Sequence, residues 1–450
     1  MAKSFVFSPR AAIDAVQAAN FAEMMDLVAA RHPYYRALMA KHGLQRGDFR
    51  TPDDLAKLPV TTKASYMAEP QSFRLESAGL PEEMRIVWDI MYTTGSTSGQ
   101  PTPFVSTTFD FYNILATNRS MLKIRRVGPG DVIANLFPLT KYPHGAFIRA
   151  LHAASVANIP VVSTLPGNPS PYFEQGNSLD GVVAIIARSK ATILWGVPSY
   201  TRRVLQRAEE LGADFAAIRM VFVTGEGLSE AAREDLVTRL TRLGAREPVI
   251  SGSYGITEMQ GGMVECRPGA GYHNPAPDQF LVEIVDPDTH RPLPDGEPGL
   301  ILLTHLKRRG TVLLRYALGD ITIRERAPCP YCGAETDRLV AMPRRHDGLV
   351  KIKGMLVNPE IIVDELSKLA AIADFQIVIA KEDPADDLSM DRLSLKVAAA
   401  GADDGLRRLI IEGVKAAVGV TPVVEFVPPA SLVDQSESWK LKQVVDLRRR

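Results

Sequence analysis

Short β-prone runs of apolar residues alternate with helical patterns through the middle of the chain, and this alternation constrains the fold more than any other feature. From Ser229 to Leu243, for example, a serine cap and an early glutamate precede leucines on one side, and Gly244 follows. Such an alternation predicts βαβ units and a parallel sheet. The apolar runs recur about every 30 residues, at 132–137, 159–163, 192–195, 220–224 and 248–250.

The pattern changes after the last of these runs. Residues 280–323 hold short strands and turns around DPDTHRPLPDGEPG, which predicts a β-rich subdomain. Beyond residue 344, a hairpin, a helix that Asn358 caps, and further strands with one more helix predict a small α+β domain.

We therefore expect an α/β fold with two parts. A large N-terminal body of several subdomains, residues 1–343, holds the parallel sheets and, at about residues 262–343, the β-rich part. A small C-terminal α+β domain follows at residues 344–450.

The composition argues against several classes of protein. The 52 Lys and Arg residues balance 52 Asp and Glu residues, so neither nucleic acid nor an anionic membrane is expected as the main partner. No apolar run approaches about 18 residues, so no membrane-spanning helix is predicted, and the N-terminus lacks the apolar core of a signal peptide. Three cysteines in 450 residues do not make a disulfide framework, which favours a reducing, cytoplasmic location.

A stretch rich in glycine and hydroxyl groups, YTTGSTSGQPT at residues 92–102, follows an apolar run that is typical of a strand. Gly95 and Gly99 allow tight turns and a close approach of the backbone to a ligand. Its hydroxyl groups and successive N–H groups suit phosphate oxygens. No lysine follows the second glycine, so it is not a GxxxxGK[ST] loop. A hydroxyl-rich surface loop remains the alternative interpretation.

Six short motifs then follow one another in a specific order: YTTGSTSGQPT, TGEG at 224–227, SYGITE at 253–258, RYALGD at 315–320, RRHDGLVKIKG at 344–354, and a late Lys440. This ordered set resembles the adenylate-forming acyl-CoA synthetase superfamily, and within it the phenylacetate–CoA ligase-like branch. The resemblance implies that a carboxylic acid attacks the α-phosphorus of Mg·ATP, which gives an acyl-adenylate and pyrophosphate. The thiol of coenzyme A then displaces AMP to give a thioester.

The resemblance implies that the glycine- and hydroxyl-rich stretch binds the β- and γ-phosphates of ATP. Ser98 stands where the family has its last glycine, and Gly99 comes one place later, so the register of this loop on the phosphates stays open. The residues concerned are Thr94, Gly95, Ser96, Thr97, Ser98 and Gly99.

Two further motifs match the segments that bind the rest of the nucleotide. The resemblance implies that Tyr254 lies against the adenine, that Thr257 contacts the α-phosphate, and that Glu258 holds Mg²⁺, a hard cation that prefers oxygen ligands. The remaining residues of these segments are Gly225, Glu226, Gly227 and Gly255.

Asp320, which closes RYALGD, matches the residue that accepts from both ribose hydroxyls, and two carboxylate oxygens suit a vicinal diol. Arg345 would add a contact to the ribose or a phosphate. The alternative for Asp320 is a turn residue after a glycine.

The C-terminal motifs match the parts that change between the two half-reactions. Asp347 corresponds to the hinge, and Lys353 and Gly354 to the thiol-accepting face, although a plain charged hairpin is the alternative. Lys440 corresponds to the late catalytic lysine, whose ammonium offsets charge that builds in the transition state. Here a tryptophan precedes it instead of the family's frequent glycine, and Lys442 is a rival.

The cysteines suggest a structural metal site. Cys329 and Cys332 have the CxxC spacing, and six residues separate Cys266 from His273. A Cys₃His set suits a closed, tetrahedral Zn²⁺ site, and some members of the branch carry one. Free buried thiols are the alternative.

The acid-binding pocket is the least constrained part of the site. Lys141, Tyr142 and His144 lie where the family places an aromatic gate and pocket wall, and Lys141 or His144 could bind a ring substituent or the carboxylate. A structural role for His144 is the alternative. An aryl or arylacetic acid is the expectation that the family implies. Further pocket candidates are Trp195, Pro198, Gly252 and Ser253.

Two other functions remain open from the sequence. An adenylating enzyme could pass the acyl group to an amine or to a carrier-protein thiol instead of coenzyme A. A catalytically inactive, zinc-stabilised nucleotide-binding scaffold belongs to a different class. The oligomeric state cannot be read from the sequence, and a homodimer is the expectation for this branch.

Overall fold

The computed structural model describes residues 4–92, 102–139, 145–167, 176–225, 227–346, 348, 350–352, 355–383, 390–432 and 443–448. Among these residues, none of the helices combines the length and the apolar character that crossing a bilayer requires.

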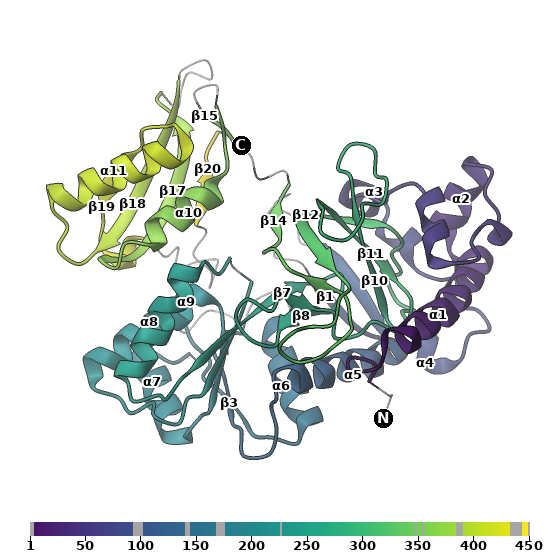
Figure 1. Cartoon of the computed structure of the whole chain (residues 1–450), viewed down its shortest axis with the longest axis horizontal. Helices are drawn as coiled ribbons and strands as arrows, with labels where there is room; N and C mark the ends of the chain where they lie inside the picture. The colour runs from purple at the N-terminus through teal and green to yellow at the C-terminus, as the bar shows by residue number, and fades with distance from the viewer. Residues whose placement is uncertain are drawn as a thin grey trace.

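A twelve-stranded sheet organises most of the described chain (Figure 1). Its strands are β3 (Ile133–Asn135), β4 (Val161–Ser163), β5 (Ile193–Gly196), β6 (Met220–Thr224), β7 (Val249–Ile256), β8 (Gly261–Glu265), β9 (Tyr272–His273), β10 (Phe280–Val285), β11 (Pro298–His305), β12 (Tyr316–Glu325), β13 (Arg338–Leu339) and β14 (Arg344–Arg345). They follow the order β10-β11-β12-β13-β9-β8-β7-β6-β5-β3-β4, and β14 pairs with β12.

The five strands β4, β3, β5, β6 and β7 are parallel to one another, which confirms the predicted parallel sheet. Helices cover both of its faces: α5 (Thr108–Ile124), α6 (Gly145–Ala157), α7 (Leu179–Ser189), α8 (Pro198–Leu211) and α9 (Glu230–Arg242). α7, α8 and α9 pack on one face through Val183, Leu205 and Leu236. α5 and α6 pack on the other through Leu122 and Ala153.

The β-rich part is present, and it continues the parallel sheet instead of forming a sheet of its own. β7 pairs antiparallel with β8, β8 with β9, β9 with β13 and β13 with β12. Local patterns predict strands but not which distant strands pair, so the sequence did not reveal this continuity. The consequence is that RYALGD on β12 and SYGITE on β7 belong to one hydrogen-bonded sheet.

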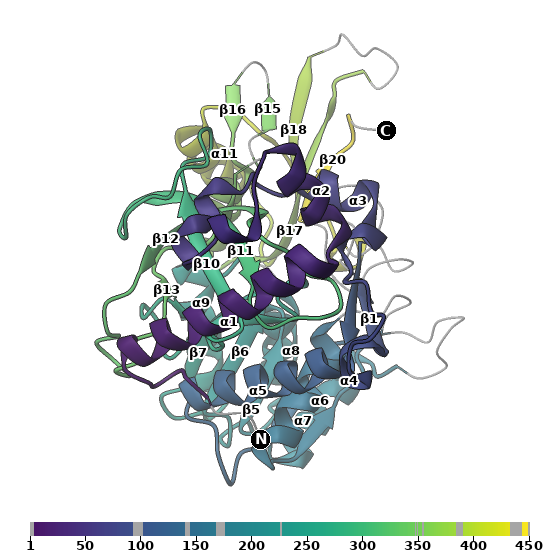
Figure 2. The ribbon, with the colours of Figure 1, turned by 90° about the vertical axis from the view of Figure 1, so that its right-hand side faces the viewer.

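The N-terminal segment packs against the antiparallel half of the sheet, as Figures 1 and 2 show. Its elements are α1 (Arg10–Arg31), α2 (Pro33–Lys41), η1 (Arg46–Asp48), η2 (Pro52–Lys57), α3 (Lys63–Ala68), η3 (Pro70–Phe73), α4 (Glu82–Arg85) and the hairpin of β1 (Val87–Tyr92) and β2 (Pro103–Thr107).

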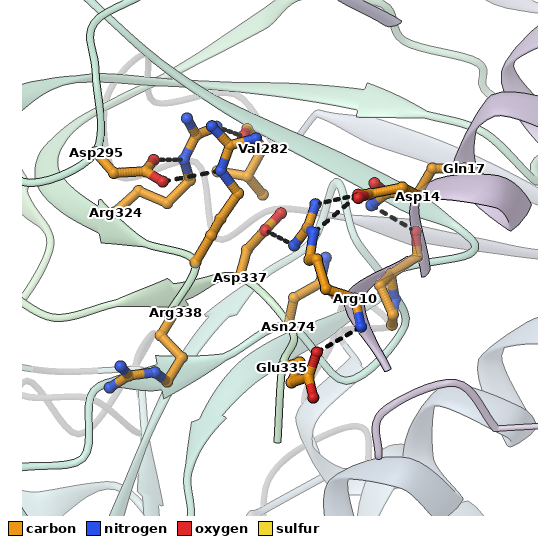
Figure 3. Close-up of polar contacts among 12 residues, drawn as sticks. Arg10, Asp14, Gln17, Asn274, Val282, Asp295, Arg324, Glu335, Asp337 and Arg338 are labelled. Carbon is orange, nitrogen blue, oxygen red and sulfur yellow. Dashed lines mark hydrogen bonds and ion pairs between the residues drawn. The ribbon is translucent and has the colours of Figure 1, made fainter. Parts of the chain in front are cut away.

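Polar contacts fix the start of α1 to the segment before β13 (Figure 3). The guanidinium of Arg10 lies 2.7 Å from the Asp337 carboxylate, and its backbone N–H donates to Glu335. Further along the helix, the Gln17 amide donates to the carbonyl of Pro277. These contacts join the first helix to the residues that follow each half of the Cys and His cluster described below, Pro277 after His273 and Glu335 and Asp337 after Cys332.

Residues 350–448 build a separate four-stranded sheet in the order β19-β18-β17-β20, with a hairpin beside it. The elements are β15 (Val350–Ile352), β16 (Met355–Val357), α10 (Pro359–Ser367), β17 (Ile372–Lys381), β18 (Asp391–Ala399), α11 (Asp404–Val418), β19 (Val423–Phe426), η4 (Pro429–Ser431) and β20 (Val444–Asp446). α10 and α11 pack on the sheet. The Asn358 side chain accepts from the N–H of Glu360, as predicted for the cap; the sequence did not predict β20.

Candidate functional site

The carboxyl ends of β6 and β7 lie side by side and carry two of the motifs. Thr224 is in register with Ser253, so the TGEG and SYGITE segments meet at this edge of the sheet. Gly255 has no side chain where a Cβ would lie 2.8 Å from the Thr224 hydroxyl, and Gly225 has a φ of +85°. The positive φ favours glycine at 225, and the close Thr224 hydroxyl favours it at 255; Gly225, Gly227 and Gly255 are all exposed around the strand ends.

Tyr254 and Asp320 meet although they are 66 residues apart in the sequence. The Tyr254 hydroxyl donates to Asp320 at 2.5 Å, and Arg345 lies opposite Asp320 on the neighbouring strand β14. The Arg345 guanidinium is 3.8 Å from the carboxylate. Burial and the nearby Asp320 raise the pKa of Tyr254 well above its usual value. The phenol therefore stays neutral and remains a donor at physiological pH.

Thr257 and Glu258 lie on the turn between β7 and β8, which is held from two sides. The N–H and side-chain amide of Gln260 both donate to the carbonyl of Thr257, at 3.0 and 2.8 Å. The ring of buried His305 lies 3.0 Å from the carbonyl of Glu258 and accepts the N–H of Leu313. Burial raises the pKa of Glu258, and Lys63 opposes that shift.

A cavity of about 270 Å³ opens between these strand ends and the helices α5 and α6. Five residues that the sequence predicts for the site line it: Trp195, Gly225, Ser253, Gly255 and Thr257. Two other predicted pocket residues lie outside its lining: Pro198 is the first residue of α8, and Gly252 sits where a Cβ would lie 2.9 Å from Glu265.

Three polar residues in the cavity wall were not found from the sequence: Arg149, Asn118 and Gln260. Arg149, on α6, and Asn118, on α5, both line the cavity and are buried. Arg149 is located five residues after His144, one turn into the helix that follows the predicted gate segment. That position was the available signal, whereas nothing local marks Asn118.

The sequence also did not reveal how β7 is held. Arg125 is buried and donates to the Ser251 hydroxyl at 2.8 Å, the carbonyl of Gly252 at 3.0 Å and the Ser253 hydroxyl at 2.5 Å. Burial lowers its pKa to about 9, so it remains a cation at pH 7. Three consecutive residues of the strand before Tyr254 are thus fixed by one side chain.

A buried ion pair supports the same strand from the other side. Glu265 accepts the N–H of Gly252 at 2.6 Å and pairs with Arg233 at 3.1 Å. Because Glu265 directly precedes Cys266, the pair also connects the strand ends to the cysteine cluster.

The four predicted metal ligands come together: one ligand atom from each of Cys266, His273, Cys329 and Cys332 lies within 4.8 Å of all the others. The sulfurs of Cys266 and Cys329 are 3.9 Å apart, and Cys332 lies 3.3 Å from Nε2 of His273. Nδ1 of His273 faces the carbonyl of Val264 at 3.2 Å, which leaves Nε2 for the cluster. This is the arrangement of ligands and support that a metal-binding histidine usually has.

Several predicted residues lie outside the described part of the chain, and their roles stay predictions. They are the phosphate-loop residues 94–99, the gate residues Lys141, Tyr142 and His144, Glu226, the hinge residue Asp347, Lys353 and Gly354, and Lys440.

Comparisons with known proteins agree with this geometry. The model of the family described as AMP-binding enzyme matches residues 87–306. The phenylacetate-coenzyme A ligase of Thermus thermophilus is 26% identical over 461 residues, which cover 98% of this chain and 98% of that protein.

Solved structures of a 2-hydroxyisobutyryl-CoA ligase share the fold. In the postadenylation state with 2-HIB-AMP, that ligase matches with a TM-score of 0.80 at 21% identity, over 98% of this chain and 90% of that chain. In the thioesterification state, with 2-HIB-AMP and CoA, it matches with a TM-score of 0.66 at 22% identity, over 98% and 91%. The arrangement of this chain is thus more similar to the first state.

Three histidines with lowered pKa values, of which His32 and His305 are buried and His152 is half-buried, predict how stability depends on pH. Burial lowers the pKa of His32 and of His152 to about 4, and it lowers that of His305 well below its usual value. The unfolded chain, with a histidine pKa of about 6.5, therefore binds protons first. The contribution of these neutral histidines to stability is complete above about pH 6.5. It is lost as the pH drops toward their pKa values in the folded protein.

We expect His305→Gln, whose amide can still donate and accept, to reduce the slope of unfolding free energy against pH below about 6 by up to 1.4 kcal/mol per pH unit. Urea titrations at several pH values measure this slope. His42→Gln, at an exposed position, is the control and should keep the wild-type slope. An unchanged slope in His305→Gln would contradict the neutral, buried state of this ring.

Proposed function

Because the chain belongs to the adenylate-forming superfamily of AMP-binding enzymes, on its phenylacetate–CoA ligase-like branch, we propose that it is an AMP-forming ligase that joins an aromatic carboxylic acid to coenzyme A. A carboxylate oxygen attacks the α-phosphorus of ATP, and pyrophosphate leaves with the β- and γ-phosphates. The sulfur of coenzyme A then attacks the acyl carbon, and AMP leaves with the oxygen that bridged it.

The observation that carries this proposal is the grouping of Tyr254, Asp320 and Arg345 beside a cavity that Thr257 lines. A neutral aromatic ring suits the adenine face, and the two carboxylate oxygens of Asp320 suit the ribose hydroxyls. Thr257 is then available to the α-phosphate, at the mouth of the cavity. Glu258, on the same turn, would hold Mg²⁺, which neutralises charge on the phosphates.

The cavity supports a small aromatic acid as the substrate. Its volume of about 270 Å³ lies just below the usual range for small-molecule sites. Met121, Phe137 and Trp195 supply apolar and aromatic wall, and glycines on β7 and β8 leave a flat side. An aryl or arylacetic acid fits this shape better than a long acyl chain does.

We further propose that residues 344–450 form a domain that turns about Asp347 between the two half-reactions. The different TM-scores to the two states of the 2-hydroxyisobutyryl-CoA ligase support such a movement. In the first half-reaction Lys440 would approach the carboxylate and α-phosphate, and in the second Lys353 and Gly354 would line the path of the thiol. A homodimer and a cytoplasmic location stay predictions.

The experiment that tests the function measures pyrophosphate release and thioester formation from ATP over benzoates, phenylacetates and indoleacetate, with and without coenzyme A. We expect one aromatic acid to support both pyrophosphate release and thioester formation. Pyrophosphate release should continue over many turnovers only when coenzyme A is present. Multiple turnover with an amine or a carrier protein, and none with coenzyme A, would favour the alternative acceptor. No ATP–pyrophosphate exchange with any acid would favour the inactive scaffold.

The two tail lysines provide a matched pair for the chemical step. We expect Lys440→Ala to lower the rate of adenylation at least 100-fold, the scale of a removed electrostatic contact in the transition state. Thioester formation from supplied acyl-AMP should change little, because that step does not use this ammonium. Lys442→Ala is the control. Equal loss of both half-reactions in Lys440→Ala, or a larger effect of Lys442→Ala, would contradict the assignment.

We also propose that the Cys and His cluster holds a structural Zn²⁺ ion. In a tetrahedron with bonds of about 2.3 Å to sulfur and 2.0–2.1 Å to nitrogen, ligand atoms are about 3.6–3.8 Å apart. The separations of 3.9 and 3.3 Å are close to these values. Four protein ligands would leave no open position for water, so the ion would stabilise the fold around β8 and β9 and take no part in the reaction.

Metal analysis checks this site. We expect about one zinc per chain, and Cys329→Ser should lose the metal and lower the melting temperature by several degrees. Tyr331→Ser, between the two cysteines and half exposed, is the control that should keep zinc. Three thiols that react freely with a disulfide reagent in a folded, metal-free, active protein would contradict the proposal.

A further inference from the structure

The wall of the cavity contains a buried cation with uncharged hydrogen-bond partners. Arg149 donates from Nε to the carbonyl of Gln260 at 3.0 Å and from Nη2 to its amide oxygen at 2.7 Å, and Nη1 lies 3.0 Å from Nδ1 of His152. Within the part of the chain that the structure describes, Arg149 has no ion-pair partner. Asp89 attracts it electrostatically without forming an ion pair.

The charge state of these partners makes the site electropositive. Burial, together with Arg149 itself, lowers the pKa of His152 to about 4, so the imidazole is neutral at pH 7. Arg149 keeps its charge there, because burial lowers its pKa only to about 10. The three contacts use three of the five guanidinium N–H groups. An oxygen acceptor on a ligand is the group that this wall lacks.

Two further side chains in the same wall hold nitrogen atoms that find no partner among the described residues. Nδ2 of Asn118 and Nε1 of Trp195 are buried and make no hydrogen bond to this part of the chain, although nearly all buried polar groups in proteins make at least one. Both side chains belong to residues that line the cavity. Leaving a buried donor unpaired costs free energy. Such donors are expected in a binding site of the free protein, because the ligand supplies their acceptors.

The position of Arg149 favours a contact with the tail of the acid over its reacting carboxylate. In Figure 1, α5 and α6 lie below β7 and β8, whereas β12 and β14, which carry Asp320 and Arg345, lie above them. Arg149 contacts Gln260, at the start of β8, and Asn118 lies on the neighbouring helix α5. Of the proposed nucleotide contacts, Tyr254, Asp320 and Arg345 do not line the cavity, whereas Thr257 does, and Gln260 donates to its carbonyl.

We propose that the acid this enzyme activates carries an oxygen acceptor on its ring, a hydroxyl or a second carboxylate, and that Arg149, assisted by Asn118 and Trp195, is the residue that selects it. The inference rests on the proposed function. It adds that plain aromatic acids are poor substrates and that acids with a cationic substituent are excluded, because a buried guanidinium repels them. The step itself is the adenylation already described and needs no further reactant.

The test compares matched acids: phenylacetate and benzoate, each unsubstituted and with a hydroxyl, carboxylate or aminomethyl group at each ring position. We expect the best oxygen-substituted acid to exceed its parent by about 10- to 100-fold in kcat/KM, the scale of a hydrogen bond to a charged group. The aminomethyl acids should fall below the parents. A hydroxyl or a carboxylate as the better group identifies which acceptor the wall is built for.

Variants then locate the selection. Arg149→Met should reduce the ratio of kcat/KM for the substituted acid over its parent to about 3 or less, and Trp195→Phe and Asn118→Leu should reduce it in part. Arg207→Met, at a surface arginine of α8 paired with Asp180, is the control that keeps the wild-type ratio. If Arg149→Met does not fold, Trp195→Phe, which keeps an aromatic ring but removes the five-membered ring with its N–H, still tests the proposal.

The outcomes separate the two proposals. Calorimetry without ATP measures the affinity of the cavity for each acid even when no reaction occurs. If no acid releases pyrophosphate but the substituted acids bind more tightly than their parents, the function fails and the selection stands. If parent acids bind and react as well as substituted ones, or if Arg149→Met affects both kinds of acid equally, the selection is wrong.

Discussion

The hydrogen bond from Tyr254 to Asp320 connects the two halves of the site, and the rest of the structure keeps these residues in place. Tyr254 directly follows the last residue of β7 that pairs with parallel β6, whereas Asp320 lies in the antiparallel part, 66 residues further on. Only because the sheet continues through β8, β9 and β13 do the two side chains belong to one rigid unit. Burial holds Tyr254 neutral and Asp320 supplies the acceptor. A neutral ring beside a carboxylate is a surface that suits a nucleoside, with its flat base and vicinal hydroxyls.

Three buried arginines of this site differ in the partners that they bind. Arg125 donates to three consecutive residues of β7 and lies over the Phe222 ring, and its Nη1 has no hydrogen-bond partner among the described residues. Arg233 is neutralised by Glu265. Arg149 contacts the turn residue Gln260 and, within the described residues, has no carboxylate partner, although it is nearly as buried. Burying a cation without a counter-charge is costly, and among these three arginines Arg149 is the one that lines the acid cavity.

The sequence predicted elements well and their partners poorly. The strand at 220–224 and the Asn358 cap are found where local patterns place them. The four ligands of the cluster also meet. The CxxC spacing indicated a metal site, and Cys266 and His273 supplied the two ligands that it lacked. The joining of β-rich and parallel parts, and the convergence of Arg125, Arg149 and Asn118 from helices, depend on long-range packing that no local period encodes. The roles of the phosphate loop and of Lys440 stay predictions.

The central claim is that one nucleotide is held against Tyr254 and Asp320 while an acid lies in the cavity beyond Thr257. A crystal structure of the protein with AMP or a non-hydrolysable ATP analogue tests it most directly. We expect the adenine to lie against the Tyr254 ring, both ribose hydroxyls to donate to Asp320, and the α-phosphate to face Thr257 at the mouth of the cavity. A nucleotide bound elsewhere, with Tyr254 and Asp320 still hydrogen-bonded only to each other, would contradict the account.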